Sequence, residues 1–215
     1  MLFVSKKMTV IYNGIRKPVF KTRDNAREEF IREYKIPKDT LWIGTVAELH
    51  RNKGIKYALE ALSLLPNEAK RKLSYLIVGD GEEKDVLRKL IRDKKLENSV
   101  FLIGFKENAV SFLPALDCFL LPSVKEGLPY VLLEAGMAKL LIIASSIGGI
   151  PEIIEHKKNG ILTTPNSPGE IKKALWSFAD TPEHFKRLGE NLFEKVKGYT
   201  LEKMLRETTM LYEMP

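Results

Sequence analysis

Residues 118–135 read Cys-Phe-Leu-Leu-Pro-Ser-Val-Lys-Glu-Gly-Leu-Pro-Tyr-Val-Leu-Leu-Glu-Ala. The apolar run at 118–121 predicts a buried strand, and the residues from Pro129 onward predict a helix. Glu126 falls in the turn between them, and Glu134 falls in the helix, whose side chains lean back toward its N-terminus. Free N–H groups at a helix start favour phosphate, and carboxylates accept hydrogen bonds from sugar hydroxyls. The pattern therefore favours a ligand that carries both phosphate and sugar.

Short apolar runs alternate with helix-like segments along most of the chain. This order is typical of a parallel sheet with helices on both faces, in which ligands bind at the carboxyl ends of the strands. We therefore predict an α/β, Rossmann-like fold that ends in a helical tail. The predicted strands span residues 41–46, 73–78, 100–103, 118–121, 140–144 and 160–162. The predicted helices span residues 27–34, 55–65, 82–95, 109–115, 129–138, 150–155, 168–179, 182–195 and 201–212.

Three segments follow from this pattern. Residues 1–40 contain only one short helix and offer no strand-rich domain. Residues 41–166 hold all of the predicted strands and form the α/β core. Residues 167–215 are helical only, and we expect them to pack on that core.

Composition limits the classes of protein. The chain has 215 residues, of which 44% are hydrophobic and 29% charged, as is ordinary for a soluble globular protein. No apolar run approaches the roughly 20 residues that span a bilayer. The only cysteine, Cys118, lies in a predicted core strand and fits a reducing cytoplasm. We therefore expect a cytoplasmic protein.

The net charge of +7 fits a phosphorylated ligand, an anionic membrane surface, nucleic acid or simply a solvated basic surface. The lysines are scattered along helix-like segments and are not interleaved with aromatic residues, so we expect no nucleic-acid partner. Peripheral association with the cytoplasmic face of a membrane stays open.

Other loops follow predicted strands at the edge where the Glu126 turn lies. Arg51, Lys53 and Gly54 follow the first strand and suit a phosphate clamp, or else form a solvated basic loop. Gly79 opens a turn after the second strand, and the glycine-rich loop 145–152 follows the fifth. Each is weak evidence alone, because a tight turn explains it equally well. Together, on one edge of a parallel sheet, they predict a ligand site.

No metal cluster, P-loop or Gly-x-Ser-x-Gly motif occurs in the sequence, since the three histidines are isolated and there is one cysteine. We therefore expect neither a metal nor another cofactor.

The motifs in this order resemble the C-terminal, nucleotide-sugar-binding half of retaining GT-B glycosyltransferases, especially glycosyltransferase family 4 (glycosyl transferases group 1). The two glutamates Glu126 and Glu134, with seven residues between them, are that family's signature. The resemblance runs from about Val10 to Tyr212 and rests on residues 10–15, 53–54, 78–81, 104–105, 121–123, 126–129, 134–135 and 148–152.

The resemblance implies roles for individual residues. It makes Glu126 a group that positions the donor sugar, Lys53 the cation that neutralises the diphosphate leaving group, and Glu134 an acceptor for the ribose hydroxyls. The remaining residues that it places around the donor are Arg51, Gly54, Gly79, Phe105, Lys106, Ser123, Gly127, Leu128 and Pro129. It implies no metal, because cations and helix N–H groups stabilise the diphosphate.

The chain departs from the family pattern in two ways. Glu48 stands where the family commonly has an arginine that pairs with the diphosphate, and it should repel the ligand unless Arg51 replaces that arginine or Glu48 points away. A whole enzyme of this type also has an N-terminal half that holds the acceptor. We expect that half to be supplied by another domain or chain, docked against the last predicted helix, residues 201–212.

Two alternatives to a donor-binding domain stay open. The first is a non-catalytic interaction module that has lost donor use through Glu48. The second is another GT-B enzyme, such as a nucleotide-sugar epimerase or a glycogen-synthase-like enzyme. The sequence does not identify the base, the sugar or the acceptor.

Overall fold

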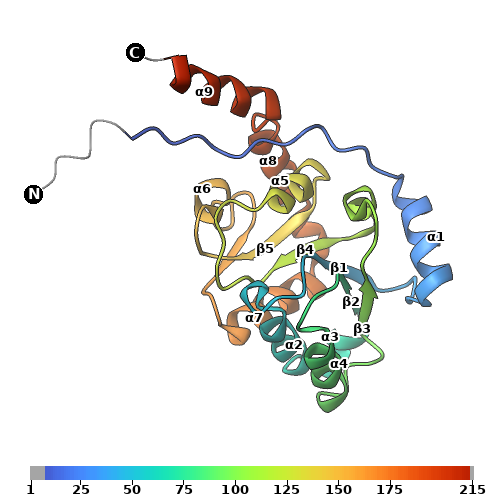
Figure 1. Cartoon of the computed structure of the whole chain (residues 1–215). Helices are drawn as coiled ribbons and strands as arrows, with labels where there is room; N and C mark the ends of the chain where they lie inside the picture. The colour runs from blue at the N-terminus through green and yellow to red at the C-terminus, as the bar shows by residue number, and fades with distance from the viewer. Residues whose placement is uncertain (1–7, 214–215) are drawn as a thin grey trace, which may run out of the picture.

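A computed structural model describes residues 8–213 of the chain (Figure 1). The predicted terminal segments extend to residues 1–7 and 214–215, which lie outside the described residues. Within residues 8–213, six strands form one parallel sheet in the order β3-β2-β1-β4-β5-β6. The strands are β1 Leu41–Val46, β2 Leu73–Val78, β3 Val100–Gly104, β4 Cys118–Leu121, β5 Leu141–Ser145 and β6 Ile161–Thr163. The predicted α/β, Rossmann-like fold is confirmed, and each strand end lies within one residue of its predicted position.

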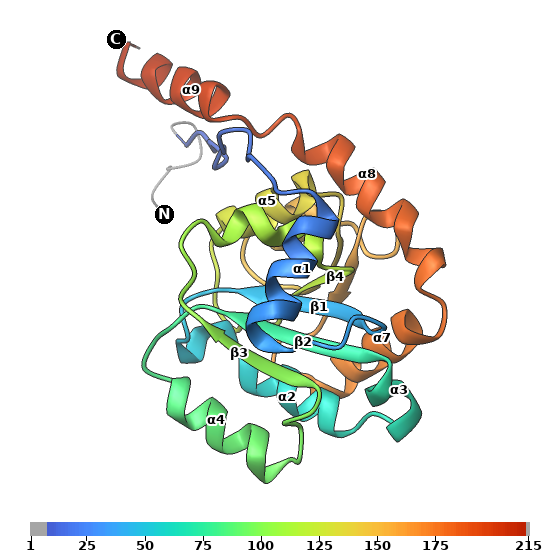
Figure 2. The ribbon, with the colours of Figure 1, turned by 90° about the vertical axis from the view of Figure 1, so that its right-hand side faces the viewer.

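Helices cover both faces of the sheet (Figure 2). One face carries α2 Ile55–Ser63, α3 Asn67–Arg71, α4 Lys84–Asp93 and α7 Pro168–Asp180. The other carries α1 Arg23–Tyr34, η2 Ala109–Ala115, α5 Tyr130–Met137, α6 Ile150–Ile153 and α8 Lys186–Val196. Three further elements are η1 Arg51–Lys53, η3 Pro182–Phe185 and α9 Leu201–Glu213. Across residues 8–213, none of the helices is long and apolar enough to cross a membrane.

The helix predictions needed four corrections. Helix α1 begins at Arg23 rather than at the predicted residue 27, because the Thr22 side chain caps it by accepting from the Asn25 N–H. Residues 109–115 form a 3-10 helix rather than an α-helix, because Pro114 inside the segment removes a backbone donor. The single helix predicted at 182–195 is divided into η3 and α8. The short helix α3 was not predicted, because five mostly polar residues show no apolar periodicity.

The sheet is apolar on both faces because every strand is sandwiched between helices. All six residues of β2 are buried, and alternate side chains enter opposite halves of the core. Tyr75 and Ile77 pack with α2 and α4, whereas Leu76 packs on the opposite face with Trp42 and Phe119. This double burial explains why the strands read as continuous apolar runs.

A buried polar group links three central strands. The hydroxyl of Thr45 lies 2.7 Å from the Tyr75 hydroxyl and donates to the carbonyl of Leu120 at 2.6 Å. Burial raises the pKa of Tyr75, so its hydroxyl stays protonated. Cys118 is buried, which confirms its prediction as a core residue, and burial likewise raises the pKa of its thiol.

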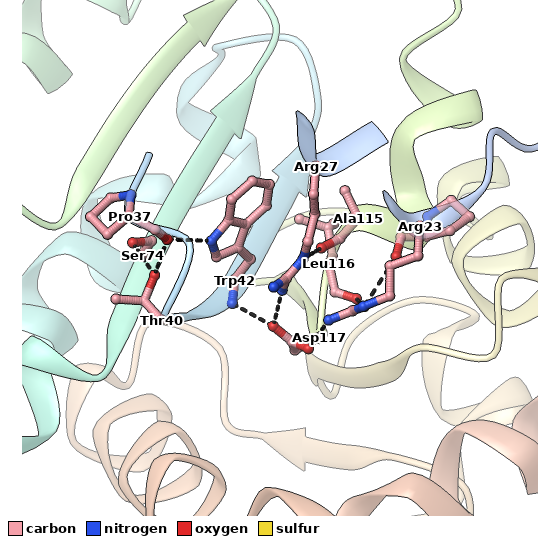
Figure 3. A network of polar contacts seen from close by, with 10 residues as sticks. Arg23, Arg27, Pro37, Thr40, Trp42, Ser74, Ala115, Leu116 and Asp117 are labelled. Atoms are coloured by element: carbon pink, nitrogen blue, oxygen red, sulfur yellow. Dashed lines mark hydrogen bonds and ion pairs between the residues drawn. The ribbon is translucent and has the colours of Figure 1, made fainter. Parts of the chain in front are cut away.

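The Asp117 carboxylate bonds helix α1 to the amino-terminal ends of the central strands β1 and β4 (Figure 3). Asp117 accepts hydrogen bonds from Arg23 at 2.5 Å, from Arg27 at 2.6 Å and from the Trp42 backbone N–H at 2.7 Å. The Arg27 guanidinium also lies 4.5 Å from the centre of the Trp42 ring. One carboxylate therefore joins α1 to the starts of β1 and β4.

The first described residues run beside the base of α9, apart from the main body (Figures 1 and 2). Ile15 exchanges backbone hydrogen bonds of 3.0 Å with Tyr199 and Leu201. A Cβ added to Gly14 would lie 2.1 Å from the Thr200 carbonyl oxygen, so only glycine permits this approach. No residue of α9 is buried, in contrast to the other long helices.

Candidate functional site

The sheet order reverses between β1 and β4, and a doubly wound sheet binds ligands at the carboxyl ends of such neighbouring strands. The loops that follow these two strands are joined directly. The Val124 N–H donates to the Asn52 carbonyl at 2.8 Å. Gly54 has φ of +62°, and a Cβ there would lie 2.1 Å from the Pro122 carbonyl oxygen. Glycine at position 54 is therefore what allows the two loops to meet.

This junction brings together three of the predicted site residues. The Lys53 ammonium lies 2.7 Å from Glu126 Oε1, and the Ser123 hydroxyl donates to the same oxygen at 2.8 Å. Ser123 is fully buried, and the Glu126 side chain is only 8% exposed. The carboxylate is thus held in one orientation beside the start of α5, whose first N–H groups lack helical acceptors.

The glycine-rich loop after β5 supports the turn that carries Glu126. Gly148 has φ of +57°, and a Cβ there would lie 2.2 Å from the Glu126 carbonyl oxygen. The Gly149 N–H donates to the Gly127 carbonyl at 2.8 Å. An added Cβ at Gly127 would meet nothing within 4 Å, so the backbone at this turn can be approached closely by a ligand.

A cavity of about 400 Å³ lies at the carboxyl ends of β1, β2 and β3, and the β1 loop that carries Lys53 contributes Ala47 and Glu48 to its wall. Gly79, Glu48 and Phe105 line it, and the Phe105 side chain is 77% exposed at its wall. Lys106 also lines the cavity, but its ammonium is held by Glu29 at 3.1 Å and Glu33 at 3.0 Å, both on α1. These ion pairs were not predicted.

Glu134 lines a second cavity, of about 490 Å³, between α5, η2 and the N-terminal segment. Burial raises the pKa of its carboxyl group, and its side chain makes no hydrogen bond with any other residue in the range 8–213. Arg16, Lys17 and Tyr130 line the same cavity. A half-buried carboxylate without a partner is suited to accept hydrogen bonds from a ligand's hydroxyl groups.

Sequence reasoning missed the contribution of the N-terminal segment. The Asn13 side-chain amide donates to the Leu128 carbonyl at 2.7 Å, across 115 residues of sequence. Residues 14–19 then form one wall of the Glu134 cavity. Residues 10–15 contributed to the family resemblance, and their Asn-Gly pair is typical of a turn, but neither signal indicates a contact with Leu128.

The remaining predicted residues lie around the cluster. Arg51 is exposed at the start of η1, and Pro129 precedes α5 in an extended conformation. His50, another residue of the β1 loop, accepts from the Asn52 N–H through Nδ1 at 3.1 Å, and its Nε2 lies 3.5 Å from Glu82 in the loop after β2. Among the described residues, no group of three or more His, Cys, Asp or Glu side chains could hold a metal ion.

A family comparison decides the assignment of this sheet and its loops. The family described as glycosyl transferases group 1 matches residues 26–195, well over half of the chain. The chain belongs to the glycosyl transferases group 1 family.

Individual relatives agree with this assignment. N-acetyl-alpha-D-glucosaminyl L-malate synthase of Bacillus anthracis is 28% identical over 210 residues, which cover 97% of this chain and 54% of that protein. Anabaena Alr3699/HepE, solved in complex with UDP-glucose, superposes with a TM-score of 0.85 at 23% identity, over 96% of this chain and 57% of that one. The C-terminal domain of the group 1 protein LpcC from Francisella tularensis superposes with a TM-score of 0.72 at 22% identity, over 86% of this chain and 96% of that one. The structural likeness shows a shared GT-B-type fold.

The chain spans about half the length of the curated relatives that it matches. The LpcC structure, which is a C-terminal domain, is by contrast covered almost completely.

Proposed function

We propose that this chain is the donor-binding half of a retaining glycosyltransferase of family 4, which binds a nucleoside diphosphate sugar. The observation that carries the proposal is the meeting of Lys53, Ser123 and Glu126 beside the start of α5, with contacts of 2.7 and 2.8 Å. A cation and free N–H groups suit a diphosphate, and a fixed carboxylate next to them suits the hydroxyl groups of the attached sugar.

In this proposal, the bond that breaks joins the sugar's anomeric carbon to the diphosphate oxygen. Negative charge develops on the leaving diphosphate, where Lys53, Arg51 and the N–H groups around Gly127 and Leu128 stabilise it. No metal is part of the proposal. The acceptor hydroxyl attacks from the face that the diphosphate leaves and passes its proton to the departing diphosphate oxygen, so the configuration is retained. Glu126 orients the sugar without forming a covalent bond.

The nucleoside would occupy the two cavities next to this cluster. Glu134 accepts hydrogen bonds from the ribose hydroxyls, and Gly79 and Phe105 line the space for the base. Because the Lys106 ammonium is held by α1, Lys106 contributes only its aliphatic chain to the wall. The HepE complexes with UDP and UDP-glucose support a donor of this chemical class.

We further propose that an acceptor-binding half docks against α9 and the N-terminal segment. Val10, Leu205 and Met210 are each at least half exposed there, and α9 has no buried residue. We divide the chain into the junction 1–40, the donor-binding core 41–166 and the C-terminal helices 167–215. The assembled enzyme would work in the cytoplasm or at the cytoplasmic face of a membrane.

Calorimetric titration of the chain with UDP, GDP and ADP at low salt tests this function. We expect saturable binding of one of the three. Lys53→Met should weaken binding about tenfold or more, because it removes a charged hydrogen bond to phosphate. Lys56→Met, an exposed neighbour in α2, is the matched control and should leave the affinity unchanged. A folded chain that binds none of the three contradicts the proposal.

One observation favours a second candidate, a non-catalytic interaction module. Glu48 is exposed on the wall of the cavity proposed for the base and places a negative charge near the diphosphate. A folded chain that ignores nucleotides yet associates through α9 would support this candidate. Binding of the nucleotide but hydrolysis or epimerisation of its sugar would instead indicate another GT-B enzyme.

A further inference from the structure

A hollow of about 550 Å³, larger than either cavity of the candidate donor site, lies along the edge of the sheet formed by β6. Its floor is apolar and comes from β6, α7, η3 and α8. Leu162, Ala174, Phe185 and Leu188 are half-buried there and leave part of their surface open to the hollow. Among residues 8–213, none lines both this hollow and a cavity of the donor site.

Basic side chains surround the apolar floor. His156, Lys157, Lys173 and His184 are all exposed at the rim. Within residues 8–213, neither lysine lies within 4.0 Å of a carboxylate oxygen. One acid, Glu170, also lines the hollow. Its two oxygens accept from the N–H and hydroxyl of Thr164 at 2.7 and 3.0 Å, and these bonds, together with the charges of Lys173 and His156, lower the pKa of its carboxyl group.

The free edge of β6 is poorly suited to pair with another strand. The strand is three residues long, and the Leu162 N–H already donates to His156 Nδ1 at 3.0 Å. The N–H of Thr164, just beyond the strand, donates to Glu170. The occupant is therefore expected to interact with side chains rather than with the backbone of β6.

We propose that this hollow binds a single-chain anionic amphiphile, such as an alkyl phosphate. Its hydrocarbon chain lies on Leu162, Phe185 and Leu188, where burial of apolar surface favours binding. Its charged head lies at the rim, where Lys157 and Lys173 offer charge-assisted hydrogen bonds. The volume is within the range of small-molecule sites. This site goes beyond the proposed donor function and does not depend on it.

Calorimetric titration of the full chain with octyl phosphate, below its micelle concentration, tests the proposal. We expect saturable binding of one molecule, with octanol and inorganic phosphate each about tenfold weaker or more, because each lacks one half of the recognition. Saturating UDP should not change the affinity. Absence of saturable binding, equal binding of octanol or of phosphate, or displacement by UDP would overturn the proposal.

Two variants locate the binding. Lys157→Glu combined with Lys173→Glu should weaken octyl phosphate about tenfold, through loss and reversal of the rim charges. The control, Lys38→Glu with Lys89→Glu, changes the net charge equally at exposed positions outside the hollow and should have no effect.

Ala174→Trp should fill the floor and block binding. Equal weakening by the control pair, or unchanged binding in Ala174→Trp, would also overturn the proposal. Thermal unfolding confirms that each variant is folded, and failure of nucleotide binding leaves this test unaffected.

Discussion

At the scale of single residues, the Glu126 carboxylate receives both of its donors on one oxygen. Lys53 and Ser123 each contact Oε1. In the unliganded protein, Glu126 therefore already neutralises the Lys53 ammonium, the cation that we assign to the diphosphate. A bound diphosphate must therefore compete with Glu126 for Lys53. When Lys53 turns toward phosphate, Ser123 still holds the carboxylate in place for the sugar.

We predict that Ser123→Ala weakens binding of the sugar nucleotide more than binding of the nucleoside diphosphate. Loss of one hydrogen bond to Glu126 should cost about 1 kcal/mol, or roughly fivefold in affinity. Ser74→Ala, a buried serine bonded to Thr40 at the start of β2, is the matched control. Calorimetry with both ligands gives the ratio, and an equal loss for the two ligands would argue against a positioning role for Ser123.

We predict that the ionised Glu134 carboxylate lowers the stability of the unliganded protein although it is needed to bind the ribose. Burial raises the pKa of its carboxyl group above the unfolded value, so the ionised form is disfavoured in the folded protein. Its contribution to stability is therefore greatest at low pH and is lost as pH rises through the folded pKa. Glutamine does not ionise, so Glu134→Gln should abolish this decrease in the free energy of unfolding and stabilise the unliganded chain at neutral pH. Urea unfolding across the pH range measures the effect.

The same variant should weaken ribonucleotide binding by about 1–3 kcal/mol, because an amide replaces a carboxylate that accepts hydrogen bonds. A 2′,3′-dideoxynucleotide should bind the variant and the original protein equally. If Glu134→Gln weakens both nucleotides alike, the carboxylate does not contact the ribose.

At the scale of elements, the site depends on loops that are bound to one another more than on any one strand or helix. Gly54 brings the β1 loop against the β4 loop, and Gly148 brings the β5 loop against the Glu126 turn. Both glycines have positive φ and lie within contact distance of a carbonyl oxygen. The sequence of these loops is therefore restricted by geometry as well as by ligand contacts.

Gly54→Ala is expected to destabilise the protein by about 2–4 kcal/mol, since alanine disfavours left-handed backbone and its Cβ would meet the Pro122 carbonyl. Gly169→Ala is the matched control, because an added Cβ meets nothing within 4 Å and the residue lies in α7. That control should be neutral or stabilising by up to about 1 kcal/mol. Urea unfolding measures both, and equal stability of the two variants would contradict the packing of these loops.

The Asp117 carboxylate is one of several groups that attach α1, beside the ion pairs of Lys106 with Glu29 and Glu33. We predict that Asp117→Asn destabilises the protein by about 2 kcal/mol, because two arginines and the Trp42 N–H lose a charged partner in a mostly buried position. Limited proteolysis should then cut within α1 more rapidly. Asp85→Asn, whose carboxylate is 88% exposed beside Arg88, should change neither property. Unaltered proteolysis of Asp117→Asn would show that the other contacts of α1 hold it without this carboxylate.

At the scale of the whole molecule, the sheet could be predicted from the sequence because a strand buried on both faces is a continuous apolar run. The sequence also placed the Lys53 loop and the Glu126 turn at one edge of the sheet, since parallel strands present their carboxyl ends together, but it did not predict the ion pair between them. The pairing of Lys106 with α1 and the bond from Asn13 to Leu128 did not follow. Both depend on how segments distant in sequence lie across the core, which local patterns do not encode.

The central claim is that a nucleoside diphosphate binds at the junction of the β1 and β4 loops. Amide NMR spectra of the full chain, recorded during titration with the nucleotide that binds in calorimetry, test it most directly. The account predicts that the largest shifts fall on the backbone N–H groups of Lys53, Gly54, Gly127 and Leu128, with smaller shifts around Glu134. Shifts confined to other surfaces, such as the hollow beside β6, would contradict it.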